Sequence, residues 1–298
     1  MGKLLRLTRP QFMLASLALF TIGAAWAVIL GAPFRLARLL LGYLIILPAH
    51  LSNSFSNDCF DLETDRHGSP TLFSGGTGTL VEHPELRRPA MRIALALIGC
   101  SLALGILFVR LYAYPLWFLG LVLLGNVLGW FYSAPPLRLA YRGLGEVSTA
   151  LIAGLLVPAM GYLVTRGVLD GNGLLFAIPL VLYSLAFILA VEIPDMEADR
   201  LGHKQTWVAQ RGRGFGFSAA GVLLLAATGF FFCIPWLRPA NPALNFRLLG
   251  LFSLLPLGPG LLGMLKRPPH RRTATWMVIS LAVFFLLADF YMVYVAIH

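Results

Sequence analysis

The chain has 298 residues, of which 58% are hydrophobic and only 12% are charged, and its mean hydropathy is +0.79. A soluble domain of this length could not cover its surface with so few charges, so the composition indicates an integral membrane protein. The net charge of +10 does not predict nucleic acid as a partner, because the placement of the basic residues matters more than their sum. The three cysteines lie far apart without a CxxC pair, which favours neither a disulfide framework nor a zinc site.

Nine apolar runs are long enough to cross a hydrocarbon core of about 30 Å. They cover roughly residues 11–31, 36–56, 91–111, 114–134, 146–165, 173–193, 216–236, 246–265 and 275–297. No small-residue cleavage site clearly ends the first run, so it reads as a retained span rather than a signal peptide. Dispersed glycines and prolines, without an alternating ten-residue pattern, argue against a barrel. We therefore predict one all-α membrane domain over residues 1–298, with about nine transmembrane helices around a central cavity.

The distribution of Lys and Arg predicts the orientation. With the N-terminus inside, 17 of the 23 basic residues fall on the inner side. The six on the outer side are Arg35, Arg38, Arg110, Arg166, Arg238 and Arg247. This bias places the N-terminus in the cytoplasm of a multi-pass cell-membrane protein.

Eight of the 13 acidic residues fall in two short clusters, each at the end of an apolar run. The first cluster is Asp58, Asp61, Glu63 and Asp65, and the second is Glu192, Asp195, Glu197 and Asp199. Both lie on the predicted cytoplasmic side. Carboxylates at the edge of a bilayer are costly unless a cation or a basic group neutralises them. Two such sets indicate bound metal, and metal held by oxygens usually means phosphate chemistry.

The clusters recur about 137 residues apart, from Asp58 to Asp195. This spacing is compatible with two pseudo-repeats, about 11–134 and 146–265, followed by a ninth helix at 275–297. A duplicated pair of acidic helix ends would face one cavity. Alternatively, the chain contains no internal repeat, and the two clusters arose separately.

Helical spacing predicts which acids act together. If the second span continues as a helix, Asp58, Asp61 and Asp65 share one face. Asp195 and Asp199 are likewise i, i+4, with Glu192 three residues before them. Glu63 and Glu197 fall off these faces, and we expect both to be solvated.

Basic residues follow each cluster and also lie between the two halves of the chain. Arg66, Arg138 and Lys204 are among them, and a diphosphate held by metal also needs such guanidinium or ammonium groups. Positive-inside bias is the competing explanation. It accounts well for Lys266, Arg267, Arg271 and Arg272, and less well for Arg138 and Lys204.

At these residues the chain resembles the UbiA superfamily of intramembrane prenyltransferases. Asn57-Asp58-x-x-Asp61-x-x-x-Asp65 matches its first aspartate motif, and Asp195-x-x-x-Asp199 looks like its second. The segments 132–138 and 142–146 resemble the central loop of that family, and Arg9-Pro10 is similar to its opening. The resemblance covers nearly the whole chain and is weakest after residue 216.

The resemblance implies a chemistry and a set of site residues. Two Mg²⁺ ions would bind a polyprenyl diphosphate whose tail lies in a channel open to lipid, and an acceptor, commonly an aromatic ring, would attack the allylic carbocation. Asp58, Asp61, Asp195 and Asp199 would be the catalytic acids. The carried-over metal ligands are Asn57, Asp58, Asp61 and Asp65 for one ion, and Asp195 and Asp199 for the other. Arg138 and Lys204, with Arg66 in addition, would bind phosphate. Independently of the resemblance, Asn126 and Tyr132 in the fourth span are candidates to border the substrate, because aromatic faces and polar groups there would lie beside the cation.

The branch of the family is indicated by the stretch from Phe73 to Glu82, which looks like the menaquinone type that acts on dihydroxynaphthoate. The segment Arg66-His-Gly-Ser-Pro-Thr departs from the loop usual in the hydroxybenzoate and haem-farnesylating branches. Thr64 before Asp65 also departs from the spacing common in menaquinone enzymes. Hydroxybenzoate, lipid, haem and pigment acceptors therefore stay open.

Other functions remain as alternatives. A divalent-cation transporter or channel would also place carboxylates in a helical bundle, although its acids would be expected at mid-membrane. A terpene cyclase or a phosphoribose transferase would share the fold. Asp289, inside the last span, and His50 each have a structural and a functional reading.

Overall fold

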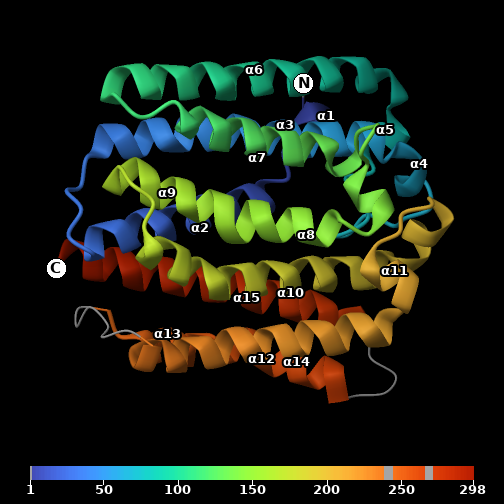
Figure 1. The fold of residues 1–298 in the computed structure, drawn as a ribbon. Helices are drawn as coiled ribbons and strands as arrows, with labels where there is room; N and C mark the ends of the chain where they lie inside the picture. The colour runs from blue at the N-terminus through green and yellow to red at the C-terminus, as the bar shows by residue number, and fades with distance from the viewer. Residues whose placement is uncertain (1, 238–243, 266–270) are drawn as a thin grey trace.

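The computed structural model describes residues 2–237, 244–265 and 271–298, and these residues form helices without any strand. The long helices run side by side along one direction, and the short ones cluster where the chain reverses (Figure 1). The all-α prediction is therefore confirmed. Arg238, Lys266 and Arg267, which entered the charge count, lie outside the described residues.

Each of the nine expected apolar runs is helical. The elements are α2 (Pro10–Ile29), α3 (Leu36–Phe60), α6 (Arg87–Tyr112), α7 (Trp117–Ser133), α8 (Gly145–Thr149) continuing through π-helical η3 (Ala150–Leu156) into α9 (Val157–Arg166), α10 (Gly171–Leu201), α12 (Arg213–Leu237), α13 (Phe246–Phe252) with α14 (Leu254–Leu265), and α15 (Arg271–Ile297). Short helices at the turns are α1 (Gly2–Arg6), α4 (Leu62–Asp65), α5 (Thr79–Glu82) and α11 (Trp207–Arg211).

Fewer helices qualify as membrane crossings than there are apolar runs in the sequence. Within the described ranges, seven helices are long and apolar enough to cross a membrane, and the pair α13–α14, bent by 44°, makes up to eight. Helix α7 is apolar but has only 17 residues. Nine crossings therefore stay a prediction, as does the cytoplasmic N-terminus.

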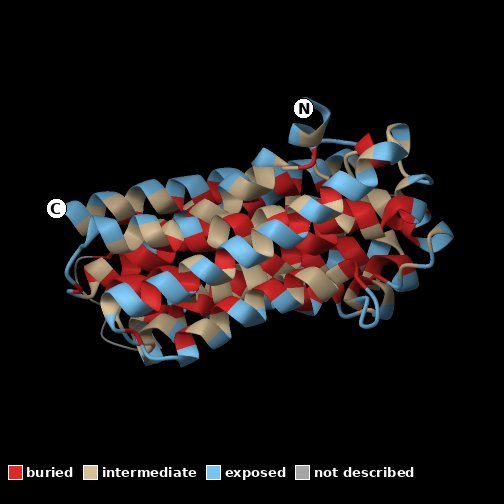
Figure 2. Cartoon of the chain, turned by 90° about the horizontal axis from the view of Figure 1, so that it is seen from above, coloured by how far each residue is buried: buried red, intermediate tan, exposed pale blue. Residues whose placement is uncertain are grey.

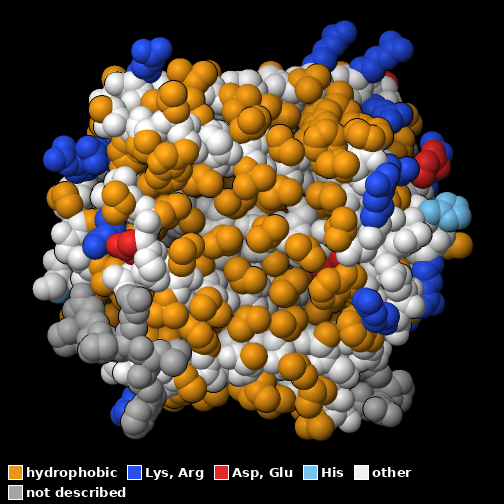
Figure 3. Space-filling view, viewed as in Figure 1, with side chains coloured by type: hydrophobic (Ala, Val, Ile, Leu, Met, Phe, Trp, Pro, Cys, Tyr) orange, Lys and Arg blue, Asp and Glu red, His pale blue; other side chains and the backbone are white. Residues whose placement is uncertain are grey.

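The surface has the character of a protein that contacts lipid. Hydrophobic side chains cover the middle of the face shown in Figure 3, whereas Lys and Arg gather at its two ends. Large apolar residues are exposed along the helices, for example Leu116 at 76% and Phe290 at 73%. This distribution fits a bundle whose helices cross a bilayer lengthwise.

Small residues let helices from the two halves of the chain approach closely inside the buried core (Figure 2). A Cβ on Gly23 of α2 would lie 1.9 Å from the Pro158 carbonyl oxygen, and a Cβ on Gly161 of α9 would lie 1.9 Å from that of Phe20. Contact at backbone distance is the usual way in which helices associate without a hydrophobic driving force. The α2–α9 contact thereby fixes the middle of the bundle around which the site is built.

The helix that carries the first acidic cluster does not continue through it. Helix α3 ends at Phe60, Asp61 has φ −90° and ψ 7°, and α4 begins at Leu62. Asp58, Asp61 and Asp65 therefore do not share the face of one continuous helix. In contrast, α10 runs for 31 residues through Pro194 and carries the whole second cluster.

The start of α10 is held by a polar cap far from the acidic clusters. Asp170 accepts hydrogen bonds from the backbone N–H groups of Asn172 and Gly173 and from the Tyr162 hydroxyl, and Arg166 pairs with it at 3.0 Å. Burial opposes ionisation of Asp170, but these donors outweigh it and lower its pKa. The carboxylate therefore stabilises the folded state above its unfolded pKa of about 3.9.

We expect Asp170→Ala to lower the apparent Tm in detergent at pH 7, because a lost cap costs about 1 kcal/mol. This difference should shrink only as the pH falls below 3.8, because the lowered pKa keeps the Asp170 carboxylate of the folded wild type ionised down to that range. Twenty-five residues of helix separate Asp170 from Asp195, a distance of about 37 Å, so catalytic turnover should not change. An unchanged Tm at pH 7 would show that the cap does not stabilise the protein.

Candidate functional site

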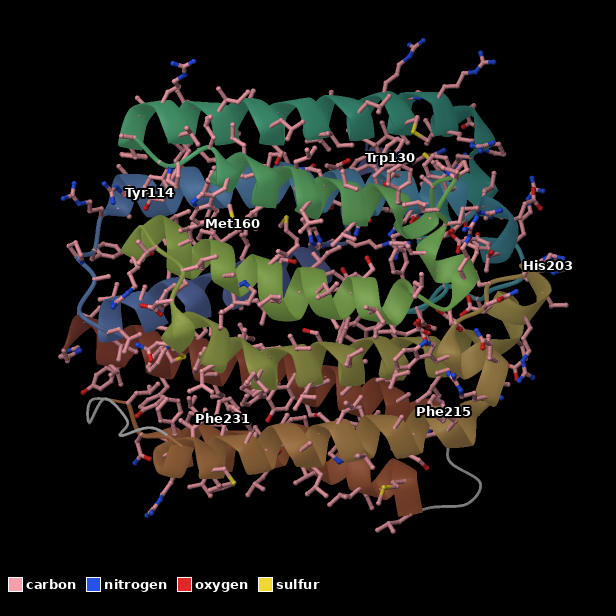
Figure 4. The ribbon with its side chains drawn as sticks, in the orientation of Figure 1. Tyr114, Trp130, Met160, His203, Phe215 and Phe231 are labelled. Carbon is pink, nitrogen blue, oxygen red and sulfur yellow. The ribbon has the colours of Figure 1, made fainter. Side chains whose placement is uncertain are left out.

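Both acidic clusters open onto one cavity of about 290 Å³ at the end of the bundle that carries α4 and α11. Its polar wall contains Arg9, Asn53, Asn57, Asp61, Asp65, Tyr132, Glu192, Asp195, Asp199 and Lys204. The wall deeper in the bundle is apolar and comes from α2, α10 and α15, with Leu19, Ile188, Val278, Leu281 and Phe285 among its residues. In Figure 4, His203, next to Lys204, marks this end, and Tyr114 marks the opposite one. A charged head group and an apolar tail would thus each meet a matching wall.

Lys204 connects the two clusters. Its ammonium donates to Asp61 at 2.8 Å, and its backbone N–H donates to the carbonyl oxygen of Asp199 at 2.8 Å. Burial alone would lower the pKa of Lys204, but the carboxylates of Asp61 and Asp199 raise it well above its ordinary value. The lysine is therefore a fixed positive charge between the two acidic sets.

Asp61 is further held by neutral donors. The Ser133 hydroxyl donates to it at 2.9 Å, as does the Tyr141 hydroxyl, also at 2.9 Å. With Lys204 these partners come from three separate parts of the chain. Asp61 is only 6% exposed, and its conformation where α3 ends is explained by these contacts.

Asp58 is neutralised from the N-terminal segment. The Arg9 guanidinium forms an ion pair with the Asp58 carboxylate, and the Thr77 hydroxyl donates to the second carboxylate oxygen at 2.5 Å. Burial would lower the pKa of Arg9, but the Asp58 charge outweighs this effect and raises it. Arg9 also lines the cavity, so it adds a second cation to the wall that holds the acids.

A glycine-containing loop, residues 74–78, connects the two clusters. The backbone N–H of Gly75 donates to Asp195 at 2.8 Å, and Gly76, at φ +65°, lies directly against Asp65. A Cβ on Gly76 would lie 2.1 Å from Asp65 Oδ2. Burial raises the pKa of Asp65 to about 7, and Asp61 adds to this effect while Lys204 opposes it.

We expect Gly76→Ala to displace Asp65 and to lower turnover at limiting Mg²⁺ by about tenfold or more, with partial recovery at high Mg²⁺. The measurement is the Mg²⁺ dependence of activity. Gly78→Ala is the matched control, because Gly78 has the same positive φ of 67° but faces Pro70 instead of an acid. Equal losses in both variants would show that backbone strain, rather than the contact with Asp65, is responsible.

The donor set fits a hard divalent cation. Asn57 Oδ1 is buried at the cavity without a hydrogen-bond partner in the described part of the chain, and the surrounding acids supply only oxygen atoms, which Mg²⁺ prefers. As they stand, no three His, Cys, Asp or Glu side chains among residues 2–237, 244–265 and 271–298 converge as a metal site. Asp58 and Asp61 instead face Arg9 and Lys204.

The predicted residues divide into two groups. Asn57, Asp61, Asp65, Tyr132, Asp195, Asp199 and Lys204 line the cavity. Asp58 is buried beside it behind Arg9, whereas Arg66 is exposed and pairs with Glu63. Arg138 stacks over the Tyr141 ring at 3.7 Å, and Asn126 lines a different cavity. Glu63 and Glu197 are exposed as expected.

Several residues of the site were not singled out by the sequence. Tyr141 and Thr77 hold acids of the first cluster, and the buried Glu146 accepts from the backbone N–H of Trp207. Arg9 was noted only as part of the opening motif. Arg9 lies in a basic segment before the first span, so nothing near it in the sequence indicated its contact with Asp58, 49 residues further along the chain.

The fold and the site define a multi-pass helical membrane protein that gathers carboxylates and cations at the polar end of an apolar cavity. Residues 17–287 match the UbiA prenyltransferase family, and the chain belongs to this family. The resemblance seen in the sequence is thereby confirmed, as is the assignment to the enzymes that transfer prenyl groups.

The individual relatives share less than a third of their residues with this chain. The 1,4-dihydroxy-2-naphthoate octaprenyltransferase of Bacillus subtilis (strain 168) is 27% identical over 240 residues, which cover 79% of this chain and 73% of the relative. A UbiA homologue from Archaeoglobus fulgidus, solved with DMAPP and Mg²⁺, superposes with a TM-score of 0.71 at 16% identity, covering 99% of each chain. The apo structure of a homologue from Aeropyrum pernix K1 gives 0.67 at 19% identity, covering 91% of this chain and 96% of the other. At these identities the two structures support the shared fold.

Proposed function

We propose that this protein transfers a polyprenyl group from a prenyl diphosphate to an aromatic quinone precursor of the dihydroxynaphthoate type, in a Mg²⁺-dependent reaction. The observation that carries the proposal is the single cavity onto which both acidic clusters open, with Lys204 between them and an apolar wall behind. The Bacillus relative supports a naphthoate acceptor, and the Archaeoglobus structure, solved with DMAPP and Mg²⁺, supports a prenyl diphosphate donor. Hydroxybenzoate, lipid, haem and pigment acceptors are the alternatives within the family.

Each part of the site has a role in this proposal. Asn57, Asp58, Asp61 and Asp65 would hold one Mg²⁺, and Asp195 and Asp199 the other. The bound ions would stabilise the negative charge that develops on the diphosphate leaving group. Lys204 and Arg9, which both line this cavity, would each bind a phosphate oxygen.

Arg66 and Arg138 have less direct roles. Arg138 would act through the Tyr141 ring on which its guanidinium stacks, and this ring reaches Asp61 by its hydroxyl. Arg66 would bind phosphate only after leaving Glu63, with which it pairs at the surface. We therefore assign the phosphate contact first to Lys204.

The apolar wall would receive the prenyl tail and exclude water from the allylic cation. Phe187 and Phe285 lie in this wall, and Tyr132 stands at its polar end. Aromatic faces stabilise a nearby cation by roughly 0.5–2 kcal/mol each. Keeping water out prevents hydrolysis of the same cation.

The proposal is tested with purified protein in lipid nanodiscs, radiolabelled geranyl diphosphate, and either 1,4-dihydroxy-2-naphthoate or 4-hydroxybenzoate. We expect a prenylated naphthoate product with Mg²⁺ and none with EDTA. Ion flux in liposomes without any prenyl transfer would favour the transporter alternative. Product from hydroxybenzoate alone would move the protein to that branch of the family.

A further inference from the structure

A second, smaller cavity of about 80 Å³ lies deeper in the bundle, between α2, α3, α6, α7 and the π-helical stretch η3. It shares His50, Asn53 and Ile152 with the wall of the main cavity. The shared residues make it a side chamber of the site. Its volume exceeds what one water molecule needs and is about half the roughly 150 Å³ of a cavity that holds benzene, so it has room for one edge of a ring.

The chamber is mostly apolar but contains an amide whose orientation is fixed. Asn126 is 6% exposed, and its Nδ2 donates both to the Ser101 hydroxyl at 3.2 Å and to the Val122 carbonyl oxygen at 2.9 Å. Both amide hydrogens are therefore used, and turning the amide round would set two oxygens against each other. The Oδ1 atom is left without a donor in the part of the chain that the structure describes.

Two more buried polar atoms near the chamber also lack a hydrogen-bond partner among the described residues. These atoms are Asn53 Oδ1 and His50 Nε2, while His50 Nδ1 contacts the Ser16 hydroxyl at 2.9 Å. Both residues line the side chamber and the main cavity. An unsatisfied buried polar atom costs free energy, so three of them around one hollow indicate that a polar ligand completes them.

The chemistry of these atoms selects the ligand. Asn126 Oδ1, whose orientation is fixed, can only accept hydrogen bonds, so it needs an O–H or N–H donor and would repel a carboxylate. The walls around it, from Ile45, Leu121 and Met160, suit a flat apolar ring. A ring that carries hydroxyl groups meets both requirements.

We propose that the side chamber is the acceptor subsite, and that it binds the hydroxyl-bearing end of an aromatic acceptor through Asn126 and Asn53. The proposal rests on the prenyl-transfer function above. It adds where the acceptor binds and which of its groups the protein recognises. The ring carbon next to the bound hydroxyl, which that hydroxyl activates for attack, then faces the main cavity, where the prenyl carbon is released. Acceptors are then selected by their hydroxyl groups, because a ring without them leaves buried oxygens unpaired.

The test compares ligand pairs that differ in hydroxyl groups. Binding of 1,4-dihydroxy-2-naphthoate and 2-naphthoate, and of 4-hydroxybenzoate and benzoate, is measured on the wild type in nanodiscs with Mg²⁺ and a non-reacting thio analogue of geranyl diphosphate. We expect the hydroxylated member of at least one pair to bind about tenfold more tightly, as one or two hydrogen bonds provide. In Asn126→Ala this preference should fall to about twofold or less, while binding of the diphosphate analogue stays unchanged.

Ser52→Ala is the matched control. Ser52 neighbours Asn53 on α3 and is only 3% exposed, but its hydroxyl donates to the Ala94 carbonyl oxygen and it lines neither cavity. Its hydroxyl preference should equal that of the wild type. If Asn126→Ala does not elute as the native protein, Asn53→Ala is measured instead, and the same loss of preference is expected.

Two results would overturn the subsite. One is a hydroxyl preference that persists in the variants, which would mean that only water occupies the chamber. The other is a wild type with no preference in either pair. Failure of the proposed function is a separate outcome, because it appears as absent prenyl transfer from radiolabelled geranyl diphosphate in the same nanodiscs, whatever the binding ratios.

Discussion

Asp195→Ala is expected to lower the turnover number for prenyl transfer by roughly three orders of magnitude, because it removes a carboxylate that would hold one of the two cations. The fold should persist. Asp195 accepts one hydrogen bond from the backbone N–H of Gly75, and its loss costs only about 1 kcal/mol. The measurement is single-turnover transfer from radiolabelled geranyl diphosphate at saturating Mg²⁺, together with the apparent Tm.

Glu197→Gln is the control for this variant. Glu197 lies two residues further along the same helix but is exposed and pairs with Arg213, away from the cavity. Its activity should stay within about twofold of the wild type. Substantial turnover by Asp195→Ala would contradict the assignment of the second acidic cluster as a cation site.

Lys204→Met is expected to lower turnover by about a hundredfold or more and to make the stability of the protein depend on Mg²⁺. The side chain is 12% exposed, and its removal leaves Asp61 and Asp199 without their shared positive charge. Breaking a buried ion pair in this way costs about 3–5 kcal/mol. A divalent cation would compensate for part of that loss, so the rise in Tm on adding Mg²⁺ should be larger in the variant than in the wild type.

Lys204→Arg keeps the charge and should recover most of the stability without Mg²⁺. It should recover less of the activity, because a guanidinium fork does not replace an ammonium at the same position. An equal Mg²⁺-dependent rise in Tm in Lys204→Met and in the wild type would show that the cation does not bind between these acids.

The helices could be predicted from the sequence because an apolar run of membrane length has few alternatives to a transmembrane helix. The helical spacing of the acids also separated Glu63 and Glu197, which are exposed, from the acids that line the cavity. These are local properties, and they survive folding because a bilayer imposes one geometry on every span.

Contacts between segments that are distant in the sequence could not be predicted in this way. The break at Asp61 depends on donors from Ser133, Tyr141 and Lys204, which lie 72 to 143 residues away. Spacing along α3 contains no information about them, so a continuous helical face was the natural expectation. Asn126 illustrates the same difficulty, because its span was recognised although the cavity that it faces was not.

The ion pairs of Arg9 and Lys204 also bear on how the protein behaves when it has no metal. A zinc finger unfolds in chelator because its ligands have nothing else to hold them together. Here the acids already have positively charged neighbours of the protein's own, so EDTA should stop the reaction while leaving the native protein intact. In a cell short of magnesium, the enzyme would then stay folded but inactive in the membrane, and it would regain activity when the ion returns.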